Sequence, residues 1–208
     1  MISSLEFLRQ NKVMAKQRRL VLASTSGYRK ELLARLGLAF EVAAPHADER
    51  PLGNEVPPDT ALRLAVLKAQ SVRALHRDAL IIGSDQVAMS GGRLLGKPGD
   101  HVTATRQLRS LSGKSADFHT AVALLDAASG ALQTEVVPCR VHFRTLDDER
   151  IEKYLQREKP YDCAGSAKAE GLGIALIARI ETEDPTSLIG LPLITLSAML
   201  ERAGLPVI

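Results

Sequence analysis

The sequence contains no tryptophan and few other aromatic residues, with three tyrosines and four phenylalanines among 208 residues. Its formal net charge is only +3, and its lysines and arginines form no dense stripe interleaved with aromatic residues. A basic surface that carries stacking aromatics is typical of nucleic-acid-binding proteins. These absences argue against a nucleic-acid partner, whereas a weakly basic chain is compatible with a small anionic ligand.

Cysteine is also scarce. Cys139 and Cys163 have no CxxC spacing, and the five histidines form no HxxxH cluster. Zinc sites need such spacings, so we expect none. Two unpaired thiols are typical of a protein in a reducing cytosol. No Ser–His–Asp or Cys–His arrangement indicates nucleophilic catalysis by a side chain.

Long apolar runs are missing too, since no stretch reaches the roughly 20 residues that cross a bilayer. Residues 1–19 are basic and weakly amphipathic, and they lack the apolar segment of a secretory signal. We therefore expect an N-terminal extension at 1–19, ordered or disordered, and a single domain over 20–208. The same absences make a cytoplasmic location the default and a membrane partner unexpected.

What the sequence does contain is an alternation of strand and helix patterns. Strands are predicted over residues 20–23, 39–44, 80–87, 118–125, 132–143 and 174–180. Helices are predicted over 103–111, 147–157 and 191–202, with one more that Asp59 caps and that runs to about residue 76. Gly91–Gly92 indicates a hairpin. Because strands, helices and hairpins intermix, we expect an α/β fold with a mixed twisted sheet flanked by helices.

The segment 20–36, LVLASTSGYRKELLARL, joins an apolar strand through a polar turn to a helix with regularly spaced leucines. The free N–H groups and the positive dipole end of a helix start can hold phosphate. Ser24, Ser26 and Arg29 would complete such a site. The simpler alternative is a turn in which a hydroxyl caps the helix and no ligand binds.

Asp85, in the segment GSDQV, comes at the C-terminal end of an apolar strand, where open α/β sheets bind ligands. Its carboxylate could hold a divalent cation or accept a proton from water. Asp48 or Glu49, in the loop after the second strand, would supply a second carboxylate for magnesium or manganese. The alternatives are an aspartate in an ordinary strand-end turn and a solvated acidic loop.

Three lysines lie near the ends of apolar elements or beside glycines, namely Lys68, Lys97 and Lys168. A lysine in such a place can neutralise phosphate oxygens, although each one alone could be a surface residue. The GxxxxGK[ST] spacing of a P-loop is absent. Hydroxyls and an arginine at a helix start, carboxylates at a strand end and lysines on loops together suit a metal-bound polyphosphate.

Several of these segments, in order and at compatible spacings, resemble the Maf family of nucleotide pyrophosphatases. They are LASTSGYRKELLARLG, Asp48–Glu49, RLAVLKA, IIGSDQV, GKP, CAGSAKAEGLG and LIGLPL. The resemblance runs from about Leu20 to the C-terminus. Within the family, GSDQV, HFR and CAGSAKAEG are similar to the 7-methyl-GTP pyrophosphatase subgroup. The family fold is similar to that of inosine-triphosphate pyrophosphatases, an elongated α/β molecule with a central cleft that is often a homodimer.

The resemblance implies a role for each position that matches a family motif. Asp85 would accept the proton of the attacking water and, with Glu49, hold a magnesium or manganese ion. The phosphates would be bound by Ser24, Arg29, Lys68 and Lys97, to which we add Lys168 from its place in the glycine-rich segment. Base preference would be set by Tyr28, Gln86 and Glu170. Two departures are Gly27, where proline is common, and Tyr28, where the subgroup can have tryptophan.

The implied reaction is hydrolysis of a nucleoside triphosphate between its α and β phosphates, with 7-methyl-GTP as the expected substrate. Methylation at N7 gives guanine a positive charge, which the ring of Tyr28 would attract. Glu170 would accept hydrogen bonds from N1–H and the 2-amino group. Two alternatives stay open: a Maf protein that prefers dTTP, UTP or another modified nucleotide, and a regulatory protein of cell division without significant catalysis.

Overall fold

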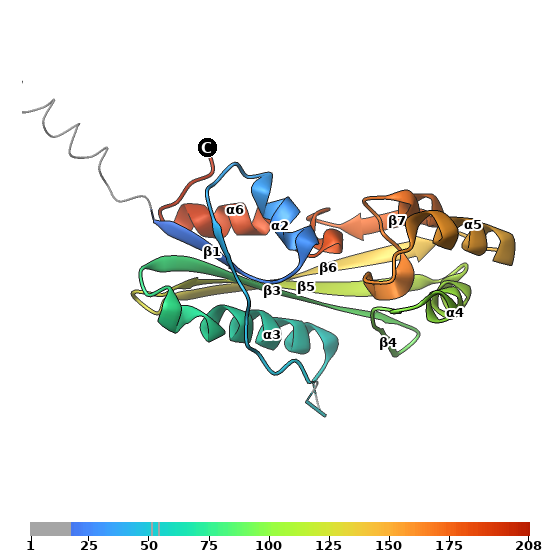
Figure 1. Cartoon of the computed structure of the whole chain (residues 1–208), viewed down its shortest axis with the longest axis horizontal. Coiled ribbons are helices and arrows are strands. Elements are labelled where there is room, and N and C mark those ends of the chain that lie inside the picture. Colours follow the sequence, from blue (N-terminus) through green and yellow to red (C-terminus); the bar gives the residue numbers. More distant parts are fainter. Residues whose placement is uncertain (1–17, 51, 54) are drawn as a thin grey trace, which may run out of the picture.

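The computed structural model describes residues 18–50, 52–53 and 55–208. Within them, a seven-stranded sheet runs along the long axis of the molecule in the order β2-β1-β3-β5-β6-β7, with β4 paired to β3 (Figure 1). The strands are β1 (Arg19–Ala23), β2 (Glu41–Ala43), β3 (Ala79–Ser90), β4 (Arg93–Leu95), β5 (Ser115–Asp126), β6 (Leu132–Phe143) and β7 (Ile177–Thr182). Strand β1 is parallel to β2 and β3, and every other pair is antiparallel. The predicted mixed α/β sheet is therefore confirmed.

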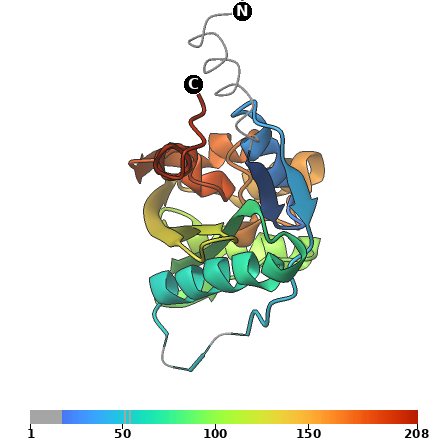
Figure 2. The ribbon, with the colours of Figure 1, turned by 90° about the vertical axis from the view of Figure 1, so that its left-hand side faces the viewer.

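Helices cover both faces of this sheet (Figures 1 and 2). They are α2 (Gly27–Ala34), α3 (Pro57–Ser71), α4 (His101–Leu111), α5 (Asp148–Glu158) and α6 (Leu193–Arg202), with 3₁₀ turns η1 (Arg73–Leu75), η2 (Ala164–Ser166), η3 (Leu172–Leu176) and η4 (Ser187–Ile189). Helices α2 and α6 lie on one face and α3 on the other, while α4 and α5 lie at the far end. Among the described residues, none of the helices has the length and apolar character needed to span a membrane.

Successive side chains of a strand point to opposite faces of the sheet, so each buried strand contributes to the hydrophobic core on both faces. Leu20 and Leu22 pack with α2 and α6, whereas Val21 and Ala23 pack on the face that α3 covers. Helix α3 comes so close to β3 that a Cβ added at Gly83 would lie 2.0 Å from the backbone oxygen of Ala65. The absence of a side chain at Gly83 therefore permits this close approach of helix α3 to strand β3.

Several predicted boundaries are wrong, and each has a local cause. Helix α3 begins at Pro57 and not at an Asp59 cap, because a proline suits the first helical turn, where its missing N–H has no intrahelical role. Asp59 lies within that first turn. The helix ends at Ser71, and η1 replaces its predicted last turn. Strand β7 begins at Ile177, three residues later than predicted, because η3 occupies residues 172–176.

The predicted N-terminal extension is mostly untested, since residues 1–17 lie outside the described part of the chain. Arg19, which we placed in that extension, opens β1 and pairs with Ala79 of β3. Its guanidinium contacts the carboxylate of Glu41 on β2 at 2.8 Å. Arg19 is therefore part of the sheet.

A gap in the pairing of β3 fixes where a ligand can enter the sheet. Strand β1 pairs with β3 as far as Ala23 and Gly83, and β4 pairs with β3 only from Ala88 onward. Between these points, residues 84–87 of β3 have no strand partner on that side in the described part of the chain. Side chains from both faces of β3 are therefore reachable from this edge, next to the carboxyl end of β1, where α/β sheets place their ligands.

Candidate functional site

A cavity of about 500 Å³ opens at this gap between β1 and β4. Apart from Asp48 and Lys168, the site residues predicted from the sequence line it: Ser24, Ser26, Tyr28, Arg29, Glu49, Lys68, Asp85, Gln86, Lys97 and Glu170. These residues come from the β1–α2 turn, the first turn of helix α2, the loop after β2, helix α3, strand β3, the loop after β4 and the glycine-rich loop after α5. Residues that are far apart in the sequence thus converge on one hollow.

The turn between β1 and α2 is built around serine hydroxyls. The N–H of Ser26 donates to Oγ of the buried Ser24 at 3.1 Å, and Oγ of Ser26 accepts from the N–H of Arg29 at 3.4 Å. Ser26 is therefore the N-cap of α2. The cap was foreseen as the simpler alternative to phosphate binding. The two are compatible, because the start of α2 also lines the cavity.

Lys68 joins the two carboxylates predicted to hold a metal. Its ammonium donates to Oδ1 of Asp85 at 2.6 Å and contacts Oε1 of Glu49 at 2.8 Å. Lys68 is 6% and Asp85 9% exposed, whereas the side chain of Glu49 is 61% exposed. Asp48 does not join this group, because its carboxylate pairs with Arg50 on the surface. Among the described residues, Oδ1 of Asp85 accepts from Lys68 and Oδ2 has no hydrogen-bond donor, so Oδ2 is the oxygen left without a protein partner.

Arg29 brings a second cation to the same place. Its Nε donates to the backbone oxygen of Gly190 at 2.8 Å, which ties α2 to the segment after η4. Burial lowers the pKa of the Arg29 guanidinium, and the negative charges of Asp85 and Glu49 oppose that effect. An arginine keeps its charge in proteins, so this end of the cavity attracts an anion that can reach the guanidinium.

Gln86 presents an acceptor to the cavity and keeps its donors for the protein. Its Nε2 donates to Oγ1 of Thr120 at 2.9 Å and lies 3.0 and 3.1 Å from the backbone oxygens of Ser187 and Leu188. Two carbonyl neighbours fix the orientation of the amide, because a flipped amide would set oxygen against oxygen. Only Oε1 is left to bind a ligand, and it can only accept hydrogen bonds.

Tyr28 and the loop after α5 form the other part of the cavity. The hydroxyl of Tyr28 lies 3.1 Å from Oδ1 of Asp162 and 3.3 Å from Sγ of Cys163. Glu170 lines the cavity from the same loop and is exposed. Lys168 does not line the cavity, although its ammonium is 5.8 Å from the centroid of the Tyr28 ring and 3.2 Å from a carboxylate oxygen of Glu158. A role for Lys168 at the phosphates stays a prediction.

The comparison with known families agrees with this geometry. The family model described as "Maf-like protein" matches residues 19–203. The chain belongs to the Maf family. The chain is 59% identical over 189 residues to a protein named 7-methyl-GTP pyrophosphatase from Thiobacillus denitrificans, with 91% of this chain and 94% of that one covered. A protein of the same name from Cupriavidus pinatubonensis is 56% identical over 188 residues, with 90% and 94% covered.

Among solved structures, this Maf chain is similar to the one titled "The structure of the Staphylococcus aureus Ham1 protein". The identity is 14%, the match covers 62% of this chain and 73% of that chain, and the TM-score is 0.42. Such a score is too low to add to the family assignment.

The carboxylates of this Maf protein fit a metal that arrives together with phosphate. No group of three or more His, Cys, Asp or Glu residues that could hold a metal ion is found in the described ranges. Magnesium in phosphate-transfer sites is usually bound by one or two carboxylates, with waters and substrate phosphates as its other ligands. Glu49 and Asp85 are close enough together to contact one cationic group, the ammonium of Lys68, and a metal at these carboxylates stays a prediction.

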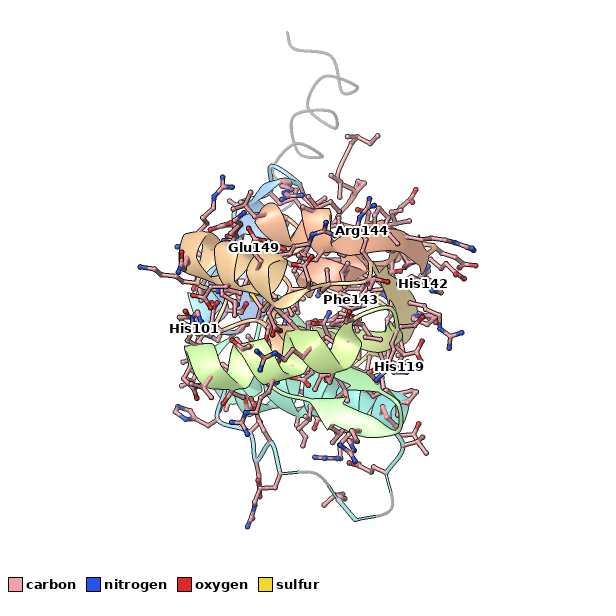
Figure 3. The ribbon with its side chains drawn as sticks, turned by 90° about the vertical axis from the view of Figure 1, so that its right-hand side faces the viewer. His101, His119, His142, Phe143, Arg144 and Glu149 are labelled. Carbon is pink, nitrogen blue, oxygen red and sulfur yellow. The ribbon has the colours of Figure 1, made fainter. Side chains whose placement is uncertain are left out.

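Sequence reasoning missed Asp162, Cys163 and the backbone of the 187–190 segment. The signal for the last was the LIGLPL motif at 188–193, which leads into α6 and carries the carbonyls of Gly190 and Leu188 that Arg29 and Gln86 contact. Asp162 directly precedes CAGSAKAEG, but nothing in its local pattern links it to Tyr28. Figure 3 shows His101, His119 and His142 at the end formed by α4 and α5, and none of these three lines the cavity.

Proposed function

We propose that this protein is a metal-dependent nucleoside triphosphate pyrophosphatase whose substrate is 7-methyl-GTP, cleaved to 7-methyl-GMP and pyrophosphate. The observation that carries the proposal is the convergence of Lys68, Asp85 and Glu49 with Arg29 in one cavity. Three cationic groups, Arg29, Lys68 and Lys97, line that cavity, as a triphosphate requires. The relatives described above carry the name of this activity.

The chemistry follows from what each side chain can do. Water attacks the α phosphorus, its proton passes to the free Oδ2 of Asp85, and the bond to the bridging oxygen breaks so that pyrophosphate leaves with the electron pair. Arg29, Lys68 and Lys97 offset the negative charge of the phosphates. A magnesium or manganese ion held by Glu49 and Asp85 would supply Lewis-acid polarisation of a phosphoryl oxygen.

The base-binding part favours a guanine over a pyrimidine. Oε1 of Gln86 and the carboxylate of Glu170 are both acceptors, and guanine offers two adjacent donors, N1–H and the 2-amino group. Uracil and thymine offer one donor flanked by two acceptors, so one protein acceptor would be left unpaired. The ring of Tyr28 would add about 0.5–2 kcal/mol for the cationic, N7-methylated base.

The test is a pyrophosphate-release assay with magnesium or manganese over 7-methyl-GTP, GTP, dTTP, UTP and CTP. We expect the highest kcat/KM for 7-methyl-GTP, and no release after chelation of the metal until it is added back. A preference for dTTP or UTP would place the protein with other Maf pyrophosphatases. Absence of release from every nucleotide would favour a regulatory role and overturn the proposal.

Glu170→Ala separates the base from the phosphates. We expect this variant to lose its preference for 7-methyl-GTP over UTP while it hydrolyses both, because GTP and 7-methyl-GTP share the donors that Glu170 would bind and uracil does not. An equal loss on every nucleotide would remove Glu170 from base recognition.

A further inference from the structure

The hydroxyl of Tyr28 joins two segments that are 134 residues apart in the sequence. Tyr28 lies in the first turn of α2, and Asp162 lies in the loop that follows α5. Both residues line the cavity, so the contact between the phenol and the carboxylate is made at the cavity wall. Other aromatic residues, such as phenylalanine and tryptophan, carry no hydroxyl, so the contact depends on the tyrosine that this chain has at position 28.

The proton positions in this contact follow from the chemistry of the groups. A carboxylate can only accept, so the hydroxyl of Tyr28 donates to Oδ1 of Asp162 at 3.1 Å. The thiol of Cys163 has one proton to donate, and its sulfur lies 3.3 Å from the phenol oxygen and 3.7 Å from Oδ1 of Asp162. Burial raises the pKa of Cys163 to about 11, so the thiol is protonated at neutral pH. The Tyr28 hydroxyl, the Asp162 carboxylate and the Cys163 thiol thereby form one cluster of polar contacts.

The loop that carries Asp162 is itself fixed. Its backbone turns through positive φ angles at Gly165 and Ser166, and Oγ of the fully buried Ser166 donates to the side chain of Gln107 on α4 at 2.5 Å. The N–H of Lys168 donates to the hydroxyl of Tyr154 on α5 at 3.0 Å. Asp162 therefore anchors Tyr28 to the layer formed by α4 and α5.

A second contact from the same loop acts on the ring. The ammonium of Lys168 lies 5.8 Å from the centroid of Tyr28 and is held by Glu158 on α5. The plane of the Tyr28 ring is thus restrained by its hydroxyl and by a cation near its face. An aromatic ring that is fixed before binding loses little entropy when a base stacks on it.

We propose that Asp162 is a positioning residue for base recognition, which holds the Tyr28 ring through its hydroxyl in the orientation that receives the base. The inference rests on the proposed function for its substrate, and it adds a residue that acts through Tyr28 and not on the reacting phosphates. Loss of the anchor should weaken nucleotide binding and base preference more than turnover.

The experiment compares Asp162→Ala, Tyr28→Phe and the double variant. Phenylalanine keeps the ring and removes only the hydroxyl. We expect KM for 7-methyl-GTP to rise about 5- to 20-fold in each single variant, which corresponds to about 1–1.8 kcal/mol for one hydrogen bond at the cavity wall. The double variant should be no worse than either single one, because both remove the same contact. Asp162→Asn keeps an acceptor and should restore KM to within about 3-fold of the original.

Glu31→Ala is the matched control, since it removes an exposed carboxylate from the same helix α2 outside the cavity. It should leave KM and base preference unchanged. Additive effects of Asp162→Ala and Tyr28→Phe, or a loss equal on 7-methyl-GTP and UTP, would overturn the proposal and leave Asp162 with a purely structural role.

Tyrosine fluorescence tests the anchor without any nucleotide, which is practical because the chain has three tyrosines and no tryptophan. A hydrogen bond from a phenol to a carboxylate quenches the fluorescence of the phenol. Asp162→Ala should therefore increase tyrosine emission when it is made in the original protein. The same substitution made in the Tyr28→Phe variant should leave the emission unchanged. An unchanged signal in the original protein would refute the contact. If the original protein released pyrophosphate from no nucleotide, the proposed function and base placement would fail, while the fluorescence would still report the anchor.

Discussion

Replacement of Asp85 by asparagine tests the proposed chemistry most directly. The change removes the carboxylate that would accept the proton of water and keeps the size of the side chain. Removal of a general base lowers turnover about 10²- to 10⁴-fold, which corresponds to about 3–5 kcal/mol in the activation barrier. We expect kcat for 7-methyl-GTP to fall within that range.

The structure also predicts how much stability this variant loses. Lys68 loses a buried charged partner at 2.6 Å, but the amide oxygen of asparagine still accepts its hydrogen bond and Glu49 remains 2.8 Å away. A loss of about 1–2 kcal/mol is expected for a weakened charge-assisted hydrogen bond. For a chain of this size, that lowers Tm by about 2–8 °C, so the variant should be folded at 25 °C.

The assay is pyrophosphate release under saturating nucleotide, with circular dichroism and thermal unfolding of the same preparation. Asp117→Asn is the control, because it removes a carboxylate that pairs with Arg140 at 2.6 Å outside the cavity. A half-exposed pair of this kind contributes at most about 1 kcal/mol, and turnover should stay within about twofold. If Asp85→Asn kept more than about a tenth of the original turnover, Asp85 would not be the base.

Three further predictions concern packing and protonation. Gly83→Ala should lower the free energy of unfolding by about 3 kcal/mol and Tm by about 6–12 °C, because the added Cβ would lie 2.0 Å from the backbone oxygen of Ala65. A decrease in Tm of less than about 2 °C would contradict this close packing of helix and sheet. Hydrogen bonds from Arg18 lower the pKa of Asp126 to about 2, so stability present above pH 4 should be lost as the pH falls toward 2, and Arg18→Ala should flatten that loss in acid unfolding. Since burial raises the pKa of Cys163 to about 11, iodoacetamide at pH 8 should alkylate it about 100-fold more slowly than a free thiol, and fast labelling by mass spectrometry would refute this.

Patterns within single segments predicted the helices and strands well where burial dominates. The helix and strand that flank Ser24 to Ser26, the long strands β3, β5 and β6, and the closing helix α6 all lie where the sequence placed them, with β3 and β5 extended at both ends. Misplaced boundaries fell where backbone chemistry competes, as at Pro57 and in the turn before Ile177. Hydrophobic periodicity carries no information about such short-range competition.

For the candidate site, too, the sequence predicted some features and only the structure shows others. Motif resemblance selected Arg29, Lys68, Asp85 and Glu49 as one set, and the structure places them around one cavity. Only the fold shows that Lys68 bridges both carboxylates, that the donors of Gln86 are used by the 187–190 segment, and that Lys168 pairs with Glu158.

By itself, the sequence determined the class of the fold, the family and most of the chemical groups at the site, because these depend on composition, local periodicity and motif order. The tertiary structure alone decided the gap beside β3, the free oxygens of Asp85 and Gln86, and the link from Tyr28 to Asp162. Each of these depends on contacts between segments that are distant along the chain. Such contacts are fixed by how the layers pack, and no local pattern encodes them.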